Sequence, residues 1–195
     1  MRIYDISKEL FTAEVYPGDP QPEQKRVFQI GQGDVCNLSV LTMGSHNGTH
    51  MDAPYHFVES GRTIEKISLE QIVGMCNVLE VQGSVGREYL EKCIPKGCVR
   101  LLLKGDFCLE VDGARYLAEQ GLRLYGIENL TVGEGEKGIR IHQILLGADM
   151  VILESLVLEE VPEGRYFLCA APLKMAGLDG SPCRPLLIEE SFFRG

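Results

Sequence analysis

Residues 46–56 read His46-Asn47-Gly48-Thr49-His50-Met51-Asp52-Ala53-Pro54-Tyr55-His56 and hold three of the four histidines of the chain. A single histidine is usually a hydrogen-bonded or surface residue. That explanation does not extend easily to three histidines and an aspartate gathered around a glycine and a proline. Imidazole nitrogen and carboxylate oxygen are ligands that zinc, manganese and iron prefer. The stretch therefore predicts a divalent-metal site.

The spacing of the first two histidines separates this site from one known kind of zinc site. His46 and His50 are four residues apart, as in the helical His-Glu-x-x-His motif of metalloproteases. Asn47 stands where that motif requires a glutamate, and Gly48 weakens a helix. Pro54 disfavours helical conformation in the residue before it. We therefore expect a loop in place of a helix.

The loop is expected to follow a strand that ends near Met43. In an extended chain, residues two apart face the same way, so His50, Asp52 and His56 are expected to share a face. Asp52 has two carboxylate oxygens and could bridge two ions if the site is binuclear. Gly48 would allow the backbone to approach the metal closely.

His142 and Glu154 are candidates for further ligands. His142 lies at the start of an apolar helical pattern, and Glu154 follows the apolar strand predicted over residues 150–153. A charged residue that ends a buried strand points into the rim where α/β proteins place their sites. On spacing alone, Glu154 is more often a solvated strand end, and His142 suits a structural role equally well. Both alternatives stay open at this point.

The apolar pattern predicts a mixed α/β domain. Runs of strand length occupy residues 3–6, 36–43, 78–81, 99–104, 122–127, 150–153, 164–170 and 186–190. Helical patterns occupy residues 87–93, 112–120 and about 140–146, and Ser68 with Gln71 forms a capping-box pattern for a short helix. Strands alternate with helices in the second half, while the first half suggests antiparallel additions. With 195 residues and no linker, we expect one domain over residues 1–195.

Composition excludes several kinds of partner and location. The net charge of −9 disfavours binding to nucleic acid and to anionic membrane surfaces. The first residues have neither the apolar core of a signal peptide nor the length of a membrane span. Seven scattered cysteines without a Cys-x-x-Cys pattern favour reduced thiols in the cytoplasm. Cys183, in a Gly/Pro-rich stretch, is the one cysteine that merits attention, although a structural role is favoured.

The motif of residues 46–56 resembles the signature of the cyclase-like metal-dependent hydrolases, which include bacterial kynurenine formamidase and isatin hydrolase. Segments 5–10, 16–20, 126–130, 142–154 and 171–182 are similar to other parts of that family, in the same order. The resemblance thus covers essentially the whole chain. It implies a swivelling β/β/α domain that assembles as a homodimer or a larger homo-oligomer.

The resemblance also implies roles for particular residues. The implied metal ligands are His46, His50, Asp52, His142 and Glu154. They would hold one or two zinc ions, with the carboxylates bridging a pair, or a single manganese ion. His56 matches the family's proton donor and acceptor. A histidine near its free pKa of about 6.5 suits both steps.

The chain departs from the family at its N-terminal turn. Family formamidases carry a substrate-contacting tryptophan there, whereas this chain contains no tryptophan and Tyr16 is the nearest match. Tyr16 is therefore the candidate substrate-binding residue, and the preference for N-formylkynurenine stays open. Alternatively, Tyr16 is an aromatic residue of the turn that packs on the core. Phe57, beside His56, is expected mainly in the core.

Together these features predict hydrolysis of a small non-peptide amide, with an N-formyl aryl amide as the first candidate. A divalent metal lowers the pKa of a bound water toward about 7 and polarises the carbonyl. His56 would take the attacking proton and pass it to the leaving amine. Serine catalysis is disfavoured because the sequence has no Gly-x-Ser-x-Gly elbow. The alternatives are an isatin or cyclic-imide hydrolase and a non-catalytic metal- or ligand-binding module, against which the spare His56 argues.

Overall fold

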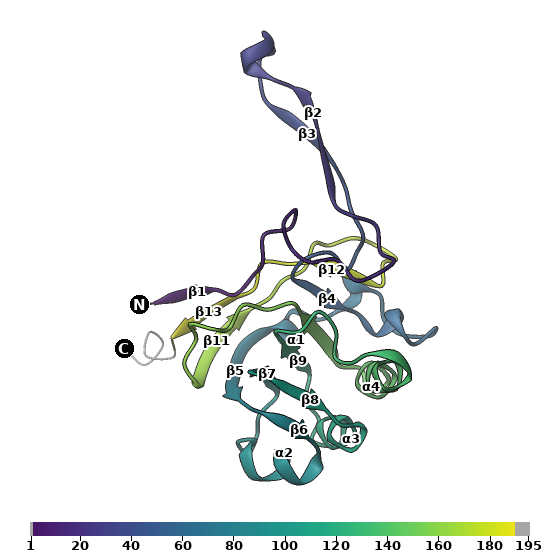
Figure 1. Cartoon of the computed structure of the whole chain (residues 1–195), viewed down its shortest axis with the longest axis vertical. Coiled ribbons are helices and arrows are strands. Elements are labelled where there is room, and N and C mark those ends of the chain that lie inside the picture. The colour runs from purple at the N-terminus through teal and green to yellow at the C-terminus, as the bar shows by residue number, and fades with distance from the viewer. Residues whose placement is uncertain (1, 190–195) are drawn as a thin grey trace.

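In the computed structural model, which describes residues 2–189, a nine-stranded curled sheet carries most of the chain (Figure 1). Its strands in spatial order are β1 (Ile3–Asp5), β13 (Leu186–Glu189), β11 (Gly164–Cys169), β5 (Val73–Glu80), β7 (Arg100–Lys104), β9 (Leu124–Ile127), β10 (Val151–Glu154), β4 (His50–Asp52) and β12 (Gly180–Pro182). The four central strands β5, β7, β9 and β10 are parallel. Antiparallel strands extend the sheet on both sides.

Buried apolar side chains cover both faces of this sheet. Successive residues of a strand point to opposite faces, and Leu102 accordingly joins one apolar cluster while Leu101 and Leu103 join the other. Parallel strands that are covered on both faces read as continuous apolar runs. This is why residues 99–104, 122–127 and 150–153 were recognisable as strands from sequence.

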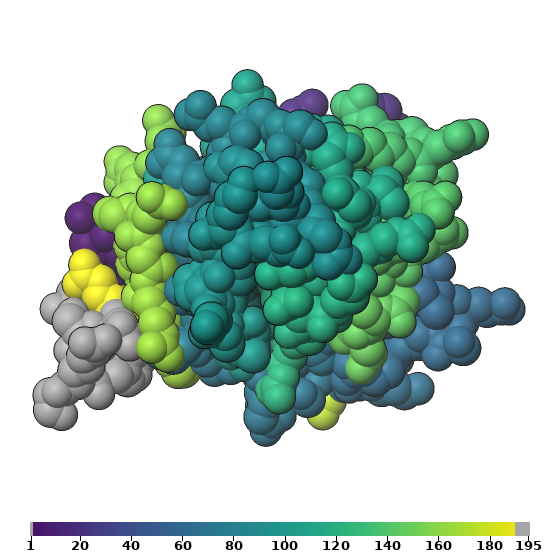
Figure 2. Space-filling view, turned by 90° about the horizontal axis from the view of Figure 1, so that it is seen from below, coloured from purple at the N-terminus to yellow at the C-terminus, as the bar shows by residue number. Residues whose placement is uncertain are grey.

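The short helix α1 (Leu69–Ile72) contributes Ile72 to the apolar cluster that contains Leu102. The opposite face of the sheet is covered by α2 (Arg87–Cys93), α3 (Val111–Glu119) and α4 (Gly135–Gly147). The last three pack in sequence, α2 against α3 and α3 against α4, and Figure 2 shows the teal and green surface that they form. A small parallel pair, β6 (Gly83–Val85) and β8 (Phe107–Leu109), lies beside them. Within residues 2–189 no helix has the length and apolar character to cross a membrane.

The strand β4 brings the two halves of the chain together. It pairs with β10 so that Asp52 lies opposite Ile152 and His50 lies opposite Glu154. On its other side it pairs with β12, where Gly180 lies opposite Asp52. Directly opposite residues point to the same face of a sheet. Ile152 belongs to the apolar cluster under the helices, so His50, Asp52 and Glu154 point toward α4.

A hairpin of β2 (Glu23–Phe28) and β3 (Leu38–Thr42) projects far from this body (Figure 1). Every residue of β2 is exposed, and so are four of the five residues of β3. Large apolar side chains are among them or lie near the hairpin tip: Val27, Phe28, Ile30, Val35, Leu38, Val40 and Leu41. The hairpin therefore presents apolar surface that the described chain leaves uncovered.

The predicted mixed α/β swivelling architecture is confirmed, but two predictions about the metal-site segments are wrong. His50–Asp52 is a strand and not part of a loop, because β10 and β12 supply hydrogen-bonding partners on both sides. His142 lies inside α4, which begins at Gly135 and not near residue 140. Gly138 interrupts the helical pattern in the sequence. It is required because a Cβ there would lie 2.0 Å from the carbonyl oxygen of Gly133.

The capping box predicted for Ser68 and Gln71 is wrong. Ser68 does precede α1, but its side chain makes no capping hydrogen bond. The Gln71 amide instead donates to the carbonyl oxygens of Arg123 and Asp149, at 3.0 and 2.8 Å. A residue with such distant partners cannot also reach back to the helix start. Of the last predicted strand, residue 190 lies outside the described residues.

All seven cysteines are free; Cys76 and Cys98 are buried, whereas Cys36 and Cys108 are exposed. Cys183 is half-buried against the core, and burial raises the pKa of its thiol to about 12. A thiol with so high a pKa is a poor nucleophile at neutral pH. The structural interpretation of Cys183 is therefore the better one.

Candidate metal centre

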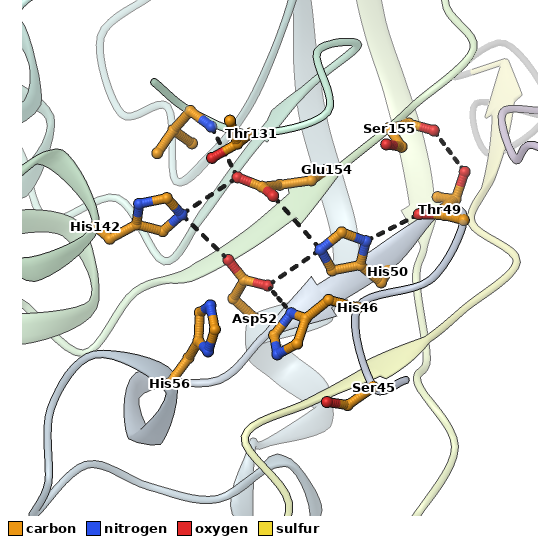
Figure 3. A network of polar contacts seen from close by, with 12 residues as sticks. Ser45, His46, Thr49, His50, Asp52, His56, Thr131, His142, Glu154 and Ser155 are labelled. Carbon is orange, nitrogen blue, oxygen red and sulfur yellow. Dashed lines mark hydrogen bonds and ion pairs between the residues drawn. The ribbon is translucent and has the colours of Figure 1, made fainter. Parts of the chain in front are cut away.

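Four histidines and two carboxylates converge between β4, β10 and α4 (Figure 3). β4 supplies His50 and Asp52, β10 ends on Glu154, and α4 supplies His142; the preceding turn carries His46, and the 3-10 turn Pro54–His56 carries His56. Asp52 and Glu154 are 0% and 4% exposed. Burying two carboxylates is costly unless they are paired or coordinate a metal. All six side chains named from the sequence are therefore brought to one place.

The ring of His50 is held in one orientation. Its Nδ1 donates to the carbonyl oxygen of Gly48 at 2.9 Å, which leaves Nε2 facing the carboxylates. Nε2 lies 3.4 Å from an oxygen of Asp52 and 3.4 Å from an oxygen of Glu154. Gly48 has a positive φ of 62°. Its role here is to turn a carbonyl toward the ligand, which differs from the expected close approach to the metal.

The ring of His142 is held in the same manner. Its Nδ1 donates to the carbonyl oxygen of Gly138 one helical turn earlier, at 2.8 Å. Its Nε2 then faces Glu154 Oε1 at 3.4 Å and Asp52 Oδ2 at 3.7 Å. Phe57 stacks on the ring, with centroids 4.3 Å apart. His50 on a strand and His142 on a helix thus direct their Nε2 atoms toward the same two carboxylates.

His46 lies between two carboxylates. Its Nδ1 is 2.8 Å from Asp52 Oδ1, and its Nε2 donates to Asp179 Oδ2 at 2.7 Å. Gly180 makes room for the ring, because a Cβ there would lie 2.6 Å from Cε1 of His46. Asp179 was not singled out from the sequence, although segment 171–182 was recognised as part of the resemblance. Its acidic side chain directly before a glycine was the available signal.

The two buried carboxylates leave room for a cation. Asp52 Oδ2 is buried without a hydrogen-bond partner, whereas Glu154 Oε1 accepts the Val132 N–H at 2.8 Å. Atoms that each lie about 2 Å from one zinc ion are about 3–3.5 Å apart. Several nitrogen–oxygen separations in the cluster, from 2.8 to 3.7 Å, fall near that range. The donor set and the orphaned oxygen therefore fit a divalent metal.

Geometry allows more than one grouping of ligands. Two sets of donor atoms are compact enough to hold an ion: His46 with Asp52 and His56, and His50 with Asp52 and Glu154. Asp52 belongs to both sets. His56 could accordingly be a ligand, and its predicted freedom for proton transfer requires a direct test.

The electrostatics of the cluster favour positive charge. Burial lowers the pKa of His46 and of His50, but hydrogen bonds to neighbouring carboxylates outweigh it and raise the pKa to about 9 and about 10. Burial raises the pKa of Asp52, yet its bonds to these histidines bring that pKa well below its usual range. Protons on histidine therefore balance the buried carboxylates. A bound divalent ion would displace them, since metal and proton compete for the same nitrogen.

His56 differs from the other three histidines. Burial lowers its pKa, and the attraction of Asp52 does not restore it. Its ring stacks on His46 at 4.0 Å, and its Nδ1 lies 3.5 Å from Asp179. Its side chain is 28% exposed, in contrast to 3% for His50. Neutral, partly exposed imidazole is the form that can accept a proton at neutral pH.

A cavity of about 580 Å³ opens over these residues. Besides the histidines, its walls include Tyr16, Asp19, Phe57, Leu130 and Ile139. This volume suits a small-molecule ligand. Phe57 both lines the cavity and packs on the core under the helices.

Tyr16 lies in the cavity wall and is 44% exposed, so it is not a core residue. Its turn is tied to the metal-site loop, because the Asn47 amide donates to the carbonyl oxygen of Pro20 at 3.1 Å. Asn47 itself is 1% exposed. Asn47, at the position where the protease motif has a glutamate, therefore holds the turn of Tyr16 in the cavity wall.

The curled mixed sheet and its histidine–carboxylate cluster define an α/β protein with a candidate divalent-metal site beneath a cavity of small-molecule size. Residues 4–134 match the family described as "Putative cyclase". The chain is 34% identical to the kynurenine formamidase of Erythrobacter litoralis, covering 96% of this chain and 94% of that protein. It is 33% identical to the kynurenine formamidase of Bacillus anthracis, with 94% and 95% covered. The chain belongs to this cyclase family.

Solved structures of other proteins have the same fold. A predicted metal-dependent hydrolase from Bacillus stearothermophilus superposes with a TM-score of 0.81 at 34% identity, covering 95% of this chain and 97% of that one. Isatin hydrolase A from Labrenzia aggregata superposes with a TM-score of 0.83 at 22% identity, covering 97% and 94%. The second likeness concerns the fold alone.

Proposed function

We propose that this chain is a metal-dependent hydrolase that cleaves the C–N bond of a small non-peptide amide, with N-formyl aryl amides as the first candidate substrates. The observation that carries the proposal is the orphaned oxygen of Asp52 among inward-facing imidazole nitrogens, beneath an open cavity. The names of the relatives, kynurenine formamidase, support the choice of substrate class.

The proposed metal ligands are His46, His50, Asp52, His142 and Glu154. Asp52 presents one oxygen to His46 and His50 and the other to His142, an arrangement that suits two ions sharing a carboxylate. The proposed metal is zinc, bound as one ion or as two, or alternatively a single manganese ion. When bound, it supplies Lewis acidity that activates water and polarises the substrate carbonyl.

The chain's own residues supply orientation and proton transfer. His56 accepts the proton released by the attacking water and returns it to the nitrogen of the leaving amine. An amine leaves poorly as an anion, so this delivery is needed before the C–N bond breaks. Phe57 packs edge-on to His56 at 4.6 Å and thereby restricts its ring.

Tyr16 is the proposed substrate-contacting residue. It lies in the cavity wall on the turn that Asn47 anchors. A phenol ring offers a face for stacking and one hydrogen-bonding group, but less area than indole. The cavity should therefore accept aryl amides that are smaller or more polar than N-formylkynurenine.

The chain is also proposed to act as a homodimer or higher homo-oligomer in the cytoplasm. An isolated two-stranded hairpin is marginally stable at best, yet β2–β3 presents apolar residues such as Val40 and Leu41 on its exposed surface. Large exposed apolar patches mark interaction sites, and a second copy of the chain is the proposed partner. The free cysteines are consistent with a reducing compartment.

The experiment combines metal analysis with a substrate panel. Purified protein is stripped with a chelator, reloaded with zinc or manganese, and assayed on N-formylkynurenine, formanilide, isatin and a cyclic imide. We expect turnover of the formyl aryl amides, lost on stripping and recovered on reloading. Equal turnover by fully demetallated protein contradicts the proposal. Preference for isatin or the imide would move the substrate to the cyclic class.

A further inference from the structure

Asp179 occupies a fixed position beside the cluster. It directly precedes β12, and its carbonyl oxygen accepts the N–H of Ala53 at 2.9 Å. This bond continues the pairing between β12 and β4, the strand that carries His50 and Asp52. The backbone of Asp179 is therefore set by the same ladder that sets the candidate ligands.

The carboxylate of Asp179 has an unusual set of partners. Oδ2 accepts a hydrogen bond from His46 Nε2 at 2.7 Å and lies 3.5 Å from Nδ1 of His56. Oδ1 accepts the hydroxyl of Ser45 at 3.1 Å. Among the ion pairs of residues 2–189, those of Asp179 involve histidine and neither lysine nor arginine. A single oxygen thus faces both a candidate metal ligand and the candidate proton carrier.

We propose that Asp179 is a positioning residue that orients His46 for metal binding and His56 for proton transfer through this one carboxylate oxygen. The inference rests on the proposed function, since it assigns His46 and His56 those two tasks. It adds a member to the site that lies outside the metal ligands themselves.

For His46, Asp179 decides which nitrogen is available. A carboxylate only accepts hydrogen bonds, so the Nε2 of His46 carries a proton that points to Asp179. Nδ1, which lies 2.8 Å from Asp52 Oδ1, is then the nitrogen where an ion would take the place of a proton. Metal-ligating histidines commonly donate their other N–H to a carboxylate, which fixes both tautomer and ring orientation. Gly48 and Gly138 do this for His50 and His142 with carbonyl groups.

For His56, Asp179 restricts the ring from one side. Its oxygen faces Nδ1, which leaves Nε2 as the nitrogen for proton exchange. The ring also stacks on His46, at 4.0 Å between centroids. A change at Asp179 should therefore disturb both histidines together.

The test compares Asp179→Asn and Asp179→Ala with the wild-type holoenzyme. Zinc affinity is measured by competition with a chromogenic chelator, and zinc stoichiometry by elemental analysis at saturation. Loss of an outer partner of a metal ligand typically weakens metal affinity about 10–100-fold. We expect that loss with unchanged stoichiometry. At saturating zinc, kcat on formanilide should fall at least about tenfold while KM changes little.

Three controls separate positioning from general damage. Asp149→Asn makes the same substitution at an exposed aspartate that pairs with Arg62 at 2.8 Å, and it should alter neither zinc affinity nor kcat. Ser45→Ala removes one support of Asp179 and should shift both quantities in the same direction by less. In a His46→Ala background, Asp179→Asn should have little further effect on zinc affinity.

The absorption spectrum of the cobalt-substituted protein gives a readout independent of turnover. Its visible bands should shift in Asp179→Asn if His46 is reoriented. Wild-type zinc affinity and kcat in Asp179→Asn overturn the inference. Loss of zinc stoichiometry equal to that of His50→Ala also overturns it, because Asp179 would then be a ligand. If wild type turns over no amide, the proposed function fails while the affinity and spectral comparisons still decide the role of Asp179.

Discussion

The strand β4 and the hairpin β2–β3 depart from the usual distribution of polarity in opposite directions. β4 is fully buried, yet two of its three residues are His50 and Asp52. The hairpin is exposed, yet Phe28, Val40 and Leu41 are among its residues. Buried charge and exposed apolar surface are the informative exceptions in a folded protein.

Each exception indicates a missing partner of different chemistry. The buried carboxylates near β4 require a cation, which is a proton or a metal ion. The apolar surface of the hairpin fits another apolar surface, and a second copy of the chain is the proposed one. One chain thus displays two unmet requirements, and the polarity of each indicates the class of its partner.

Removing a ligand on β4 should have the largest effect. His50→Ala takes away a nitrogen that lies 3.4 Å from both Asp52 and Glu154, so we expect loss of bound metal and amide hydrolysis at background level. Metal content is measured by elemental analysis. Phe28→Ala on the hairpin is the control and should keep its metal. Full metal occupancy in His50→Ala would remove this residue from the ligand set.

Removing His56 should abolish chemistry while sparing the metal. General acid–base catalysis contributes about 10²–10⁴-fold, so kcat of His56→Ala should fall at least about a hundredfold. Its metal stoichiometry should equal that of wild type. Should His56→Ala bind metal as poorly as His50→Ala, His56 is itself a metal ligand, as its compact grouping with His46 and Asp52 allows.

Charged substitutions in the hairpin should dissociate the proposed dimer without changing the metal site. Val40→Asp with Leu41→Asp places carboxylates on a surface proposed to be buried between two chains. A buried apolar side chain contributes about 1.5–3 kcal/mol, so the dimer dissociation constant should rise at least about tenfold. Analytical ultracentrifugation measures it, with Leu69→Asp on the body as the matched control. A monomeric wild type would contradict the dimer.

The buried cluster also predicts a pH dependence for the metal-free protein. His46 and His50 have pKa values raised to about 9 and about 10 from an ordinary 6.5. Their contribution to stability is therefore complete below pH 6.5 and is lost as the pH rises through 9 to 10. A bound ion replaces these protons, so preloaded protein should lack this loss. By calorimetry, the Tm difference between the two forms should widen by about 2–4 °C or more between pH 6.5 and 9.5. A constant difference would contradict the charge balance described for the cluster.

The smallest expected effect concerns Tyr16 in the cavity wall. Tyr16→Trp enlarges the stacking surface and should raise kcat/KM for N-formylkynurenine relative to formanilide by about 1 kcal/mol, or about fivefold. Metal content should stay unchanged because the residue is not a proposed ligand. The two substrates are compared at equal metal loading. If the ratio of the two kcat/KM values does not change, Tyr16 lines the cavity without selecting the substrate.

The sequence predicted the parts of this site that are local. Histidine is rare here, so the motif from His46 to His56 was visible without any structure. The central strands were visible because both of their faces are apolar. In contrast, β4 has only three residues, too few for a recognisable strand pattern, and its conformation depends on β10 and β12, which lie far along the chain.

The remote members of the site were not derivable from spacing. Glu154 faces the cluster because of the register between β4 and β10, and His142 because α4 packs against β10. The spacing left both roles open, and the family resemblance favoured the ligand role. Asp179 depends on the pairing of β12 with β4, which joins a Gly/Pro-rich segment to the motif. Long-range register is the information that a single sequence does not display.

The register that places His50 opposite Glu154 also sets when the protein can acquire its ion. The motif is synthesised early, but its partners on α4 and β10 follow about a hundred residues later. Ribosomes add about 5–20 residues per second, so the motif waits roughly 5–20 s before the remaining ligands exist. The proposed centre is therefore incomplete until Glu154 has been made and β10 has paired with β4. Metal loading in the proposed geometry follows that pairing.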